Sequence, residues 1–158
     1  MTGNDAAQTP NADPPPNTRG GRERAPRETP WPVFETDSAR HAVPEARRRA
    51  VAFVRDTCPG ADLIAVQLVL GELISNAVRH TAAGTWHLLL RADETALTMT
   101  VTDSSSRLPQ PRQADPFDGL GGFGLHIVGR LCDSNTVTVH ESGKAVTVSW
   151  MLPHRPIA

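Results

Sequence analysis

The sequence is poor in cysteine, in aromatic side chains and in long apolar runs, and each shortage excludes a class of protein. Its 158 residues include two cysteines, Cys58 and Cys132, too few for a disulfide framework. No apolar run reaches the roughly 18 residues that a membrane-spanning helix needs, and the N-terminus has no apolar signal segment. Tyrosine is absent, so aliphatic side chains must form most of the core. We therefore expect a cytoplasmic protein with reduced thiols, with a disulfide between these two cysteines as the alternative.

Neither sign of charge is in clear excess. The chain has 16 basic and 17 acidic residues, which gives a formal net charge of −1. Bulk charge therefore gives no reason to expect a nucleic-acid or membrane surface. A local run of arginines at residues 47–49 indicates a solvated helix face, with a basic face that binds a partner as the alternative.

The first 30 residues differ in composition from the rest of the chain. Residues 1–30 hold six of the 14 prolines and contain no Val, Ile, Leu, Phe or Trp. Such a segment cannot bury enough apolar surface to offset the entropy lost on ordering. We expect a disordered tail over residues 1–30, either a plain leader or a docking segment, and one globular domain over residues 31–158.

Hydrophobic periodicity predicts strands and helices in the globular part. A short strand is expected at residues 31–36, at an edge because of Pro32. A first helix follows to about residue 56, beginning either after Ser38 or only near Pro44, which suits a first turn. A second helix, with Asp62 at its start, should extend to about residue 80. It should be buried, because it is apolar on most sides.

After Gly84 the pattern changes to the period of two that is typical of strands. Further strands are expected at residues 86–91, 96–103, 136–140 and 145–152, and a helix at about 122–131. A loop over residues 104–120 is long enough to be a functional lid. This order of elements predicts an α+β fold, a two-layer α/β sandwich with helices on one face of a mixed, mostly antiparallel sheet.

Polar residues in the apolar second helix are candidates for chemistry. Glu72 and Asn76 lie four residues apart and share a face, and His80 extends this stripe with Arg79 beside it. A buried carboxylate and amide need partners, and Mg²⁺ with phosphate groups would satisfy both. Glu72 could then orient or deprotonate a nucleophile. The alternative is a polar stripe that faces solvent.

Two later motifs also carry candidate chemistry. Asp103 begins the segment DSSSRLP and is either an acceptor for an exocyclic amine, such as that of adenine, or the first residue of an Asx turn. The segment GLGGFG at residues 119–124 would bring backbone amides to an anion at a helix N-terminus. A dinucleotide-binding unit is excluded, because no strand directly precedes this motif and no βαβ unit surrounds it.

The three motifs together resemble the GHKL ATPase family, which includes gyrase, histidine kinases and MutL. ELISNAVRH, DSSSRLP and GGFGLHIV begin at residues 72, 103 and 121, in the family's order and at its intervals. Over about residues 33–153 the chain is similar to the anti-sigma-factor serine/threonine kinases and their actinomycete relatives. The resemblance implies the Bergerat-type ATP-binding fold, with ATP and Mg²⁺ as cofactors.

By position, the resemblance implies roles for the polar residues of the second helix. Asn76 would hold Mg²⁺ against the phosphates. Glu72 would be the general base or would orient water. His80 or Arg79 would lie near the phosphate end of the nucleotide.

The resemblance also implies an adenine site and a lid. Asp103 would bind the adenine amine, and Ser105 stands where the wider family has glycine, which we take as a mark of the subfamily. Phe123 replaces a frequent basic residue, and Ala145 replaces a threonine often offered to the adenine site, so nucleotide affinity could be poor. Gly121, Gly122 and Gly124 would form the lid hinge and phosphate cradle, with Phe123 between them and Leu125 packing behind.

These motifs lead to one functional hypothesis and two alternatives. The chain would be an ATP-binding anti-sigma factor that phosphorylates an anti-anti-sigma protein of the STAS type. As a homodimer it would hold a sigma factor when that antagonist is absent. The first alternative is a non-catalytic or degenerate GHKL scaffold that acts by partner binding alone. The second is a detached histidine-kinase catalytic domain. Neither nucleic acid nor a membrane is expected as a direct partner.

Overall fold

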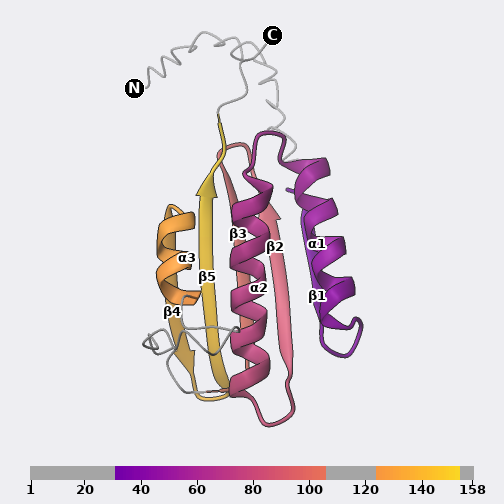
Figure 1. Ribbon diagram of the computed structural model, residues 1–158, viewed down its shortest axis with the longest axis vertical. Helices are drawn as coiled ribbons and strands as arrows, with labels where there is room; N and C mark the ends of the chain where they lie inside the picture. Colours follow the sequence, from indigo (N-terminus) through magenta and orange to yellow (C-terminus); the bar gives the residue numbers. More distant parts are fainter. Residues whose placement is uncertain (1–30, 106–123, 154–158) are drawn as a thin grey trace, which may run out of the picture.

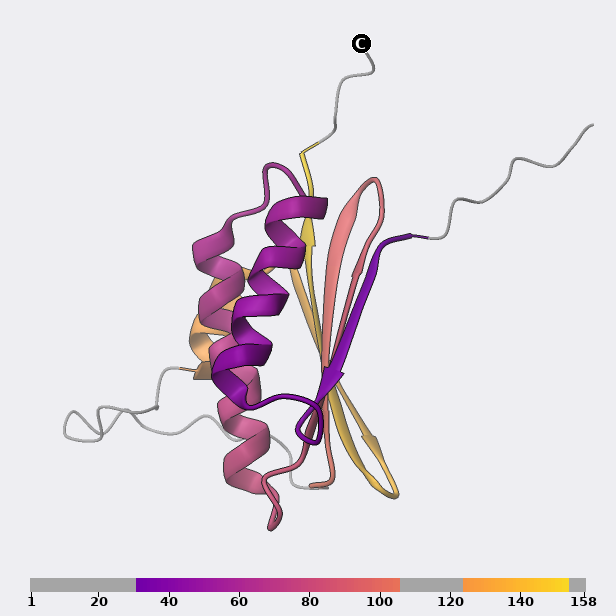
Figure 2. The same cartoon turned by 90° about the vertical axis from the view of Figure 1, so that its right-hand side faces the viewer.

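The computed structural model describes residues 31–105 and 124–153, so the expected tail at 1–30 lies outside the described residues. The elements are β1 (Val33–Asp37), α1 (Val43–Thr57), α2 (Leu63–His80), β2 (Trp86–Ala92), β3 (Ala96–Asp103), α3 (Gly124–Leu131), β4 (Ser134–His140) and β5 (Gly143–Met151). Figure 1 and the perpendicular view in Figure 2 show the helices together on one face of the sheet. The predicted two-layer α/β sandwich is therefore confirmed.

The described strands form one sheet in the order β1-β2-β3-β5-β4, and each neighbouring pair is antiparallel. Alternation along β3 shows how the sheet divides its side chains. Leu97, Met99 and Val101 are buried beneath the helices, whereas the threonines between them are half-buried on the opposite face. A period of two in the sequence thus produces one apolar and one polar face.

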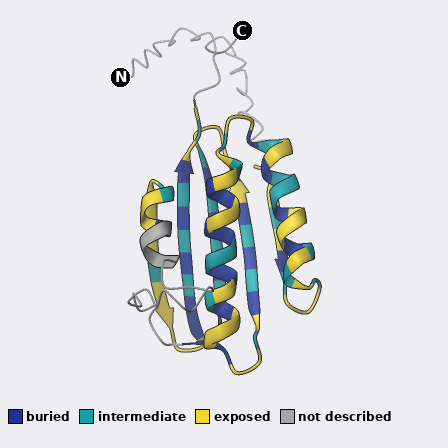
Figure 3. Ribbon diagram, viewed as in Figure 1, coloured by how far each residue is buried: buried dark blue, intermediate teal, exposed yellow. Residues whose placement is uncertain are grey.

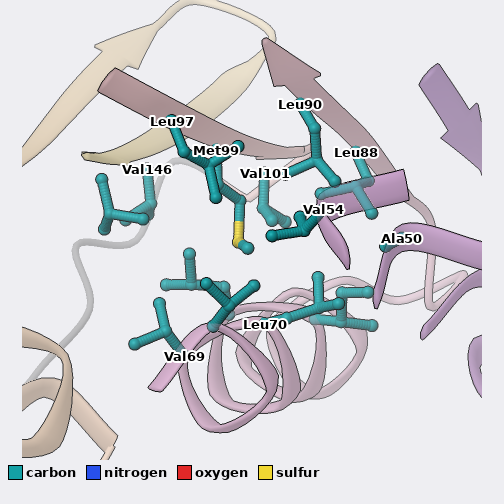
Figure 4. Packing of buried hydrophobic residues seen from close by; sticks show 14 of the residues in the cluster. Ala50, Val54, Val69, Leu70, Leu88, Leu90, Leu97, Met99, Val101 and Val146 are labelled. Atoms are coloured by element: carbon teal, nitrogen blue, oxygen red, sulfur yellow. The ribbon is translucent and has the colours of Figure 1, made fainter. Parts of the chain in front are cut away.

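The hydrophobic core lies between the sheet and the helices. Figure 3 shows buried positions on the central strands and on the inner sides of α1 and α2. Figure 4 shows Met99 directed from β3 toward Val69 and Leu70 of α2, and all three side chains are fully buried. Within the described part of the chain, no helix combines the length and apolarity needed to cross a membrane.

The start of α1 settles one of the alternatives left open by the sequence. The helix begins at Val43, and Pro44 lies in its first turn, where proline's missing amide hydrogen has no intrahelical partner to lose. Ser38 instead lies in the preceding turn, where its hydroxyl oxygen accepts a bond from the Trp86 amide at 3.4 Å. Small buried residues, Ala46 and Ala50, let α1 lie close to the rest of the core.

Two of the three arginines at residues 47–49 are engaged on their own helix. Arg48 and Arg49 both form ion pairs with Glu45 while their side chains remain largely exposed. The bonds from Arg49 and then Arg48 lower the pKa of Glu45. The guanidinium of Arg47 lies over α2, with a nitrogen 3.2 Å from where a Cβ on Gly71 would stand. This arrangement fits the solvated-face interpretation.

The prediction that α2 is buried is only partly right. Asp62 caps the helix by accepting bonds from the amides of Ile64 and Ala65, both at 3.0 Å. The inner side is buried, but Ile64 is 71% exposed, Leu68 50% and Val78 38%. The expectation failed because the fold has two layers, so the sheet and the neighbouring helices leave the outer side of α2 uncovered.

Asp93 stabilises the tight turn between β2 and β3. Its Oδ1 accepts bonds from the Thr95 amide at 2.7 Å, the Thr95 hydroxyl at 2.8 Å and the Ala96 amide at 2.8 Å. These bonds, with the Thr95 amide first, lower the pKa of Asp93 below its ordinary value of 3.8. Because the folded pKa is the lower one, the carboxylate stabilises the fold above pH 3.8 and loses this effect as the pH falls.

We therefore expect Asp93→Asn to lower the free energy of unfolding at pH 7 by less than about 1 kcal/mol, since the turn is exposed. The difference from wild type should shrink as the pH falls below about 4. Chemical denaturation at several pH values measures it, with Glu94→Gln on the same turn as the control. A difference that stays constant down to pH 2 would contradict the assignment.

Candidate functional site

Neighbouring strands bring candidate residues to one end of the sheet. β3 ends at Asp103, which the register pairs with Trp86 at the start of β2 and with Lys144 near the start of β5. α2 ends at His80 shortly before the chain enters β2, so its last turns lie over the same end. We call this region, at the bottom of Figure 1, the sheet-end site.

A buried ion pair occupies the strand ends of this site. The Nζ atom of Lys144 lies 2.9 Å from Oδ1 and 2.8 Å from Oδ2 of Asp103. The side chains are 1% and 3% exposed, respectively. By alternation both point to the helix-covered face, as do Val101 and Val146 on the same strands. An ammonium so placed offsets much of the cost of burying a carboxylate.

Asp103 also forms the local bond expected of an Asx turn. Its Oδ1 accepts a bond from the backbone amide of buried Ser105 at 2.8 Å. Asx geometry does not exclude an acceptor role, because a carboxylate has about four acceptor positions. The contacts described here use two at Oδ1 and one at Oδ2, which leaves a position at Oδ2. This free acceptor position fits an exocyclic amine, such as that of adenine, which would donate the hydrogen bond.

Gly143 controls how closely β5 approaches the end of β3. Its φ is +148°, a conformation that side chains other than glycine rarely adopt. A Cβ added there would lie 2.0 Å from the carbonyl oxygen of Asp103 and 2.9 Å from the Cα of Ser104. Only glycine therefore allows the β4–β5 hairpin to hold Lys144 against Asp103.

The candidate residues on α2 lie together on its half-exposed side. Glu72 and Asn76 are half-buried, and neither side chain has a hydrogen-bond or ion-pair partner among the residues that the structure describes. Arg79 and His80 are exposed, and the Nε of Arg79 donates to the Ser75 carbonyl at 3.3 Å. An unpartnered amide oxygen beside an unpartnered carboxylate fits a hydrated Mg²⁺ bound with phosphates.

The lid is only partly within the described residues. Gly121, Gly122 and Phe123, expected in the lid hinge and phosphate cradle, lie outside them. Gly124 and Leu125 are the first two residues of α3, where the backbone is described. The structure thus leaves the roles predicted for these five residues as predictions. In the described ranges, no group of three His, Cys, Asp or Glu side chains could hold a metal ion.

The structure corrects the interpretation of Ala145. The resemblance suggested that this position faces the adenine site, but Ala145 pairs with Thr102 on the open face of the sheet. Alternation places Lys144 and Val146, not Ala145, on the same face as Asp103. The missing threonine at position 145 therefore does not remove a polar group from the sheet-end site.

Lys144 is the site residue that the sequence analysis missed. The strands expected at residues 136–140 and 145–152 left Lys144 in the connection between them, but β5 already begins at Gly143, which places Lys144 inside a strand. Two signals could have identified it. Lys144 is the only lysine in a chain with 15 arginines, and it alternates in phase with Val146, Val148 and Trp150. A lone lysine on an apolar face requires a buried acid.

The described residues thus form a two-layer sandwich with a buried, ion-paired carboxylate at the end of a central strand. Residues 36–150 match the family described as the histidine kinase-like ATPase domain. The chain belongs to this GHKL-type family, and membership implies that it binds ATP. A search of curated proteins finds no match.

We expect Gly143→Ala to lower the free energy of unfolding by more than about 2 kcal/mol, because it adds both a clash and an unfavourable φ. Gly129→Ala on α3 is the matched control: its Cβ would meet only Asn135 Nδ2 at 3.9 Å, so helix propensity should raise stability by about 0.5–1 kcal/mol. Thermal and chemical unfolding measure both. Equal effects of the two substitutions would contradict the role assigned to Gly143.

Proposed function

We propose that this chain is a serine/threonine protein kinase that uses Mg²⁺ and ATP, and that it acts as an anti-sigma factor. The observation that carries the proposal is the pairing of two features at one end of the domain. Glu72 and Asn76 are half-buried, have no partner among the described residues, and lie in the C-terminal half of α2; the ion-paired carboxylate of Asp103 lies at the end of β3 near which α2 ends. An acceptor for a base and ligands for a phosphate-bound cation are thus available in one region.

Each side chain then has a distinct task. Asp103 would accept a hydrogen bond from the adenine amine, and the side-chain oxygen of Asn76 would be a ligand for a phosphate-bound Mg²⁺. This cation supplies neutralisation of phosphate charge when bound. Arg79 and His80, exposed at the end of the same helix, lie near the phosphate end. By the resemblance, the amides of Gly121, Gly122 and Gly124 would contribute to the phosphate cradle, with Phe123 in the lid and Leu125 packing behind.

Glu72 performs the proton transfer. Its carboxylate accepts the proton of a serine hydroxyl on the partner protein. The hydroxyl oxygen forms a bond to the γ-phosphorus, the bond from that phosphorus to the β,γ-bridging oxygen breaks, and ADP leaves. Phosphoryl transfer depends mainly on positioning and charge neutralisation, so the proton transfer itself requires only one well-placed carboxylate from the protein.

The partners follow from the resemblance of the three motifs to the anti-sigma-factor kinases. The phosphorylated protein is an anti-anti-sigma protein of the STAS type. A dimer of this chain holds a sigma factor when the STAS protein is absent. Incubating the chain with ATP and purified candidate STAS proteins, followed by mass spectrometry of the products, tests this part of the proposal. Phosphohistidine in place of phosphoserine or phosphothreonine would contradict it.

For the metal site, we expect Asn76→Ala to lower the affinity for Mg²⁺ and ATP roughly 100-fold while leaving the melting temperature nearly unchanged. Isothermal titration calorimetry measures the affinity. Ser75→Ala, at the adjacent exposed position, is the matched control and should bind like wild type. Retained affinity in Asn76→Ala would contradict the assigned ligand.

For catalysis, we expect Glu72→Gln to retain nucleotide binding and to lower the transfer rate by a factor of about 10²–10⁴, the usual contribution of a general base. Single-turnover transfer of labelled phosphate to a STAS protein measures the rate. Gln67 is exposed and lies earlier on α2. Gln67→Glu tests whether a carboxylate elsewhere on this helix changes the transfer rate, and we expect it to leave that rate unchanged. An undiminished rate in Glu72→Gln would remove Glu72 from the mechanism.

A further inference from the structure

The ion pair at the sheet-end site occupies most of the acceptor capacity of Asp103. Oδ1 accepts from the Ser105 amide at 2.8 Å and from Lys144 Nζ at 2.9 Å, whereas Oδ2 contacts only Lys144 Nζ, at 2.8 Å, among the described residues. Each carboxylate oxygen offers about two acceptor positions. Oδ1 is therefore saturated, and Oδ2 retains one position for a further donor.

We propose that Lys144 is a positioning residue for base selection: it holds the Asp103 carboxylate so that Oδ2 alone accepts the 6-amino group of adenine. This inference rests on the proposed role of Asp103 in ATP binding and deepens it. Lys144 acts through Asp103 and does not itself contact the base. The Ser105 amide assists by donating to Oδ1 at 2.8 Å.

The surroundings of the pair support a fixed carboxylate. Lys144 bridges both oxygens, so rotation of the carboxylate would break charge-assisted bonds in a buried place. The close contact of Gly143 with the Asp103 carbonyl fixes the spacing of the two strands at this point. Without the ammonium, the carboxylate would lose the two charge-assisted bonds that fix it, and the Ser105 amide alone would hold it, at Oδ1.

Base selectivity is the property that separates positioning from simple structural support. Inosine triphosphate carries a carbonyl oxygen where ATP carries the 6-amino group, so it offers Oδ2 an acceptor in place of a donor. For wild type we expect ATP to bind roughly 10- to 100-fold more tightly than inosine triphosphate, the range for a hydrogen bond to a charged group. A purely structural lysine would affect both nucleotides equally.

The first experiment measures the affinities of the full chain for ATP and for inosine triphosphate by calorimetry. We expect Lys144→Gln to reduce the affinity ratio to below about 3, and Lys144→Arg, which keeps the cation, to restore most of it. Arg91→Gln, which removes the same charge from an exposed position on β2, is the matched control and should retain the wild-type ratio.

The affinities distinguish an error in the role of Lys144 from an error in the nucleotide site at Asp103. If wild type prefers ATP and Lys144→Gln retains the full preference, Lys144 is not a positioning residue, although the nucleotide site stands. If wild type binds neither nucleotide at millimolar concentration, the ATP site at Asp103 is wrong and this inference is wrong with it.

A second measurement uses wild-type protein and does not depend on the variants folding. Because Lys144 is the only lysine, selective isotope labelling of lysine gives one side-chain signal in an NMR spectrum. We expect ATP to shift this signal and inorganic triphosphate, which has no base, to leave it in place. An unmoved signal at saturating ATP, or the same shift with inorganic triphosphate, would overturn the proposal.

Discussion

The buried ion pair between Lys144 and Asp103 is the interaction on which the candidate site depends. A carboxylate that is 3% exposed needs a compensating charge, and Lys144 supplies it on the adjacent strand. The pair in turn requires Gly143, because a larger residue would separate β5 from the end of β3. One electrostatic contact thus links the sheet register, the β4–β5 hairpin and the carboxylate that would recognise the base.

Much of the fold could be predicted from the sequence, because the signals were local. The bounds of β3 were predicted by its alternation, and the C-terminal end of α2 at His80 was predicted from the extent of its apolar stretch. The start of α1 was ambiguous between Ser38 and Pro44, since each residue suits a helix beginning in its own way. The exposure of the outer side of α2 was missed because sequence hydrophobicity does not report how many layers cover a helix.

The candidate site was only partly predictable, for a different reason. The motifs identified Asp103, Glu72 and Asn76 one segment at a time. The role of Lys144, by contrast, depends on its pairing with Asp103, which lies 41 residues earlier in the sequence on another strand. Lys144 was assigned to the connection between two strands because the last strand was expected to begin only at residue 145, whereas β5 begins at Gly143. An error of two residues in a strand boundary thus decided whether this side chain was assigned to a loop or to the core. The same register argument places Ala145 on the face of the sheet opposite to Asp103, since side chains alternate between faces of a sheet.

We propose that this end of the sheet binds ATP together with Mg²⁺, through Asp103 for the base and Asn76 for the cation. Calorimetric titration of the full chain with ATP, in the presence and absence of Mg²⁺, tests it most directly. We expect saturable binding to a single site that strengthens markedly when Mg²⁺ is present. Absence of binding at millimolar ATP, or binding of the same strength without Mg²⁺, would contradict it.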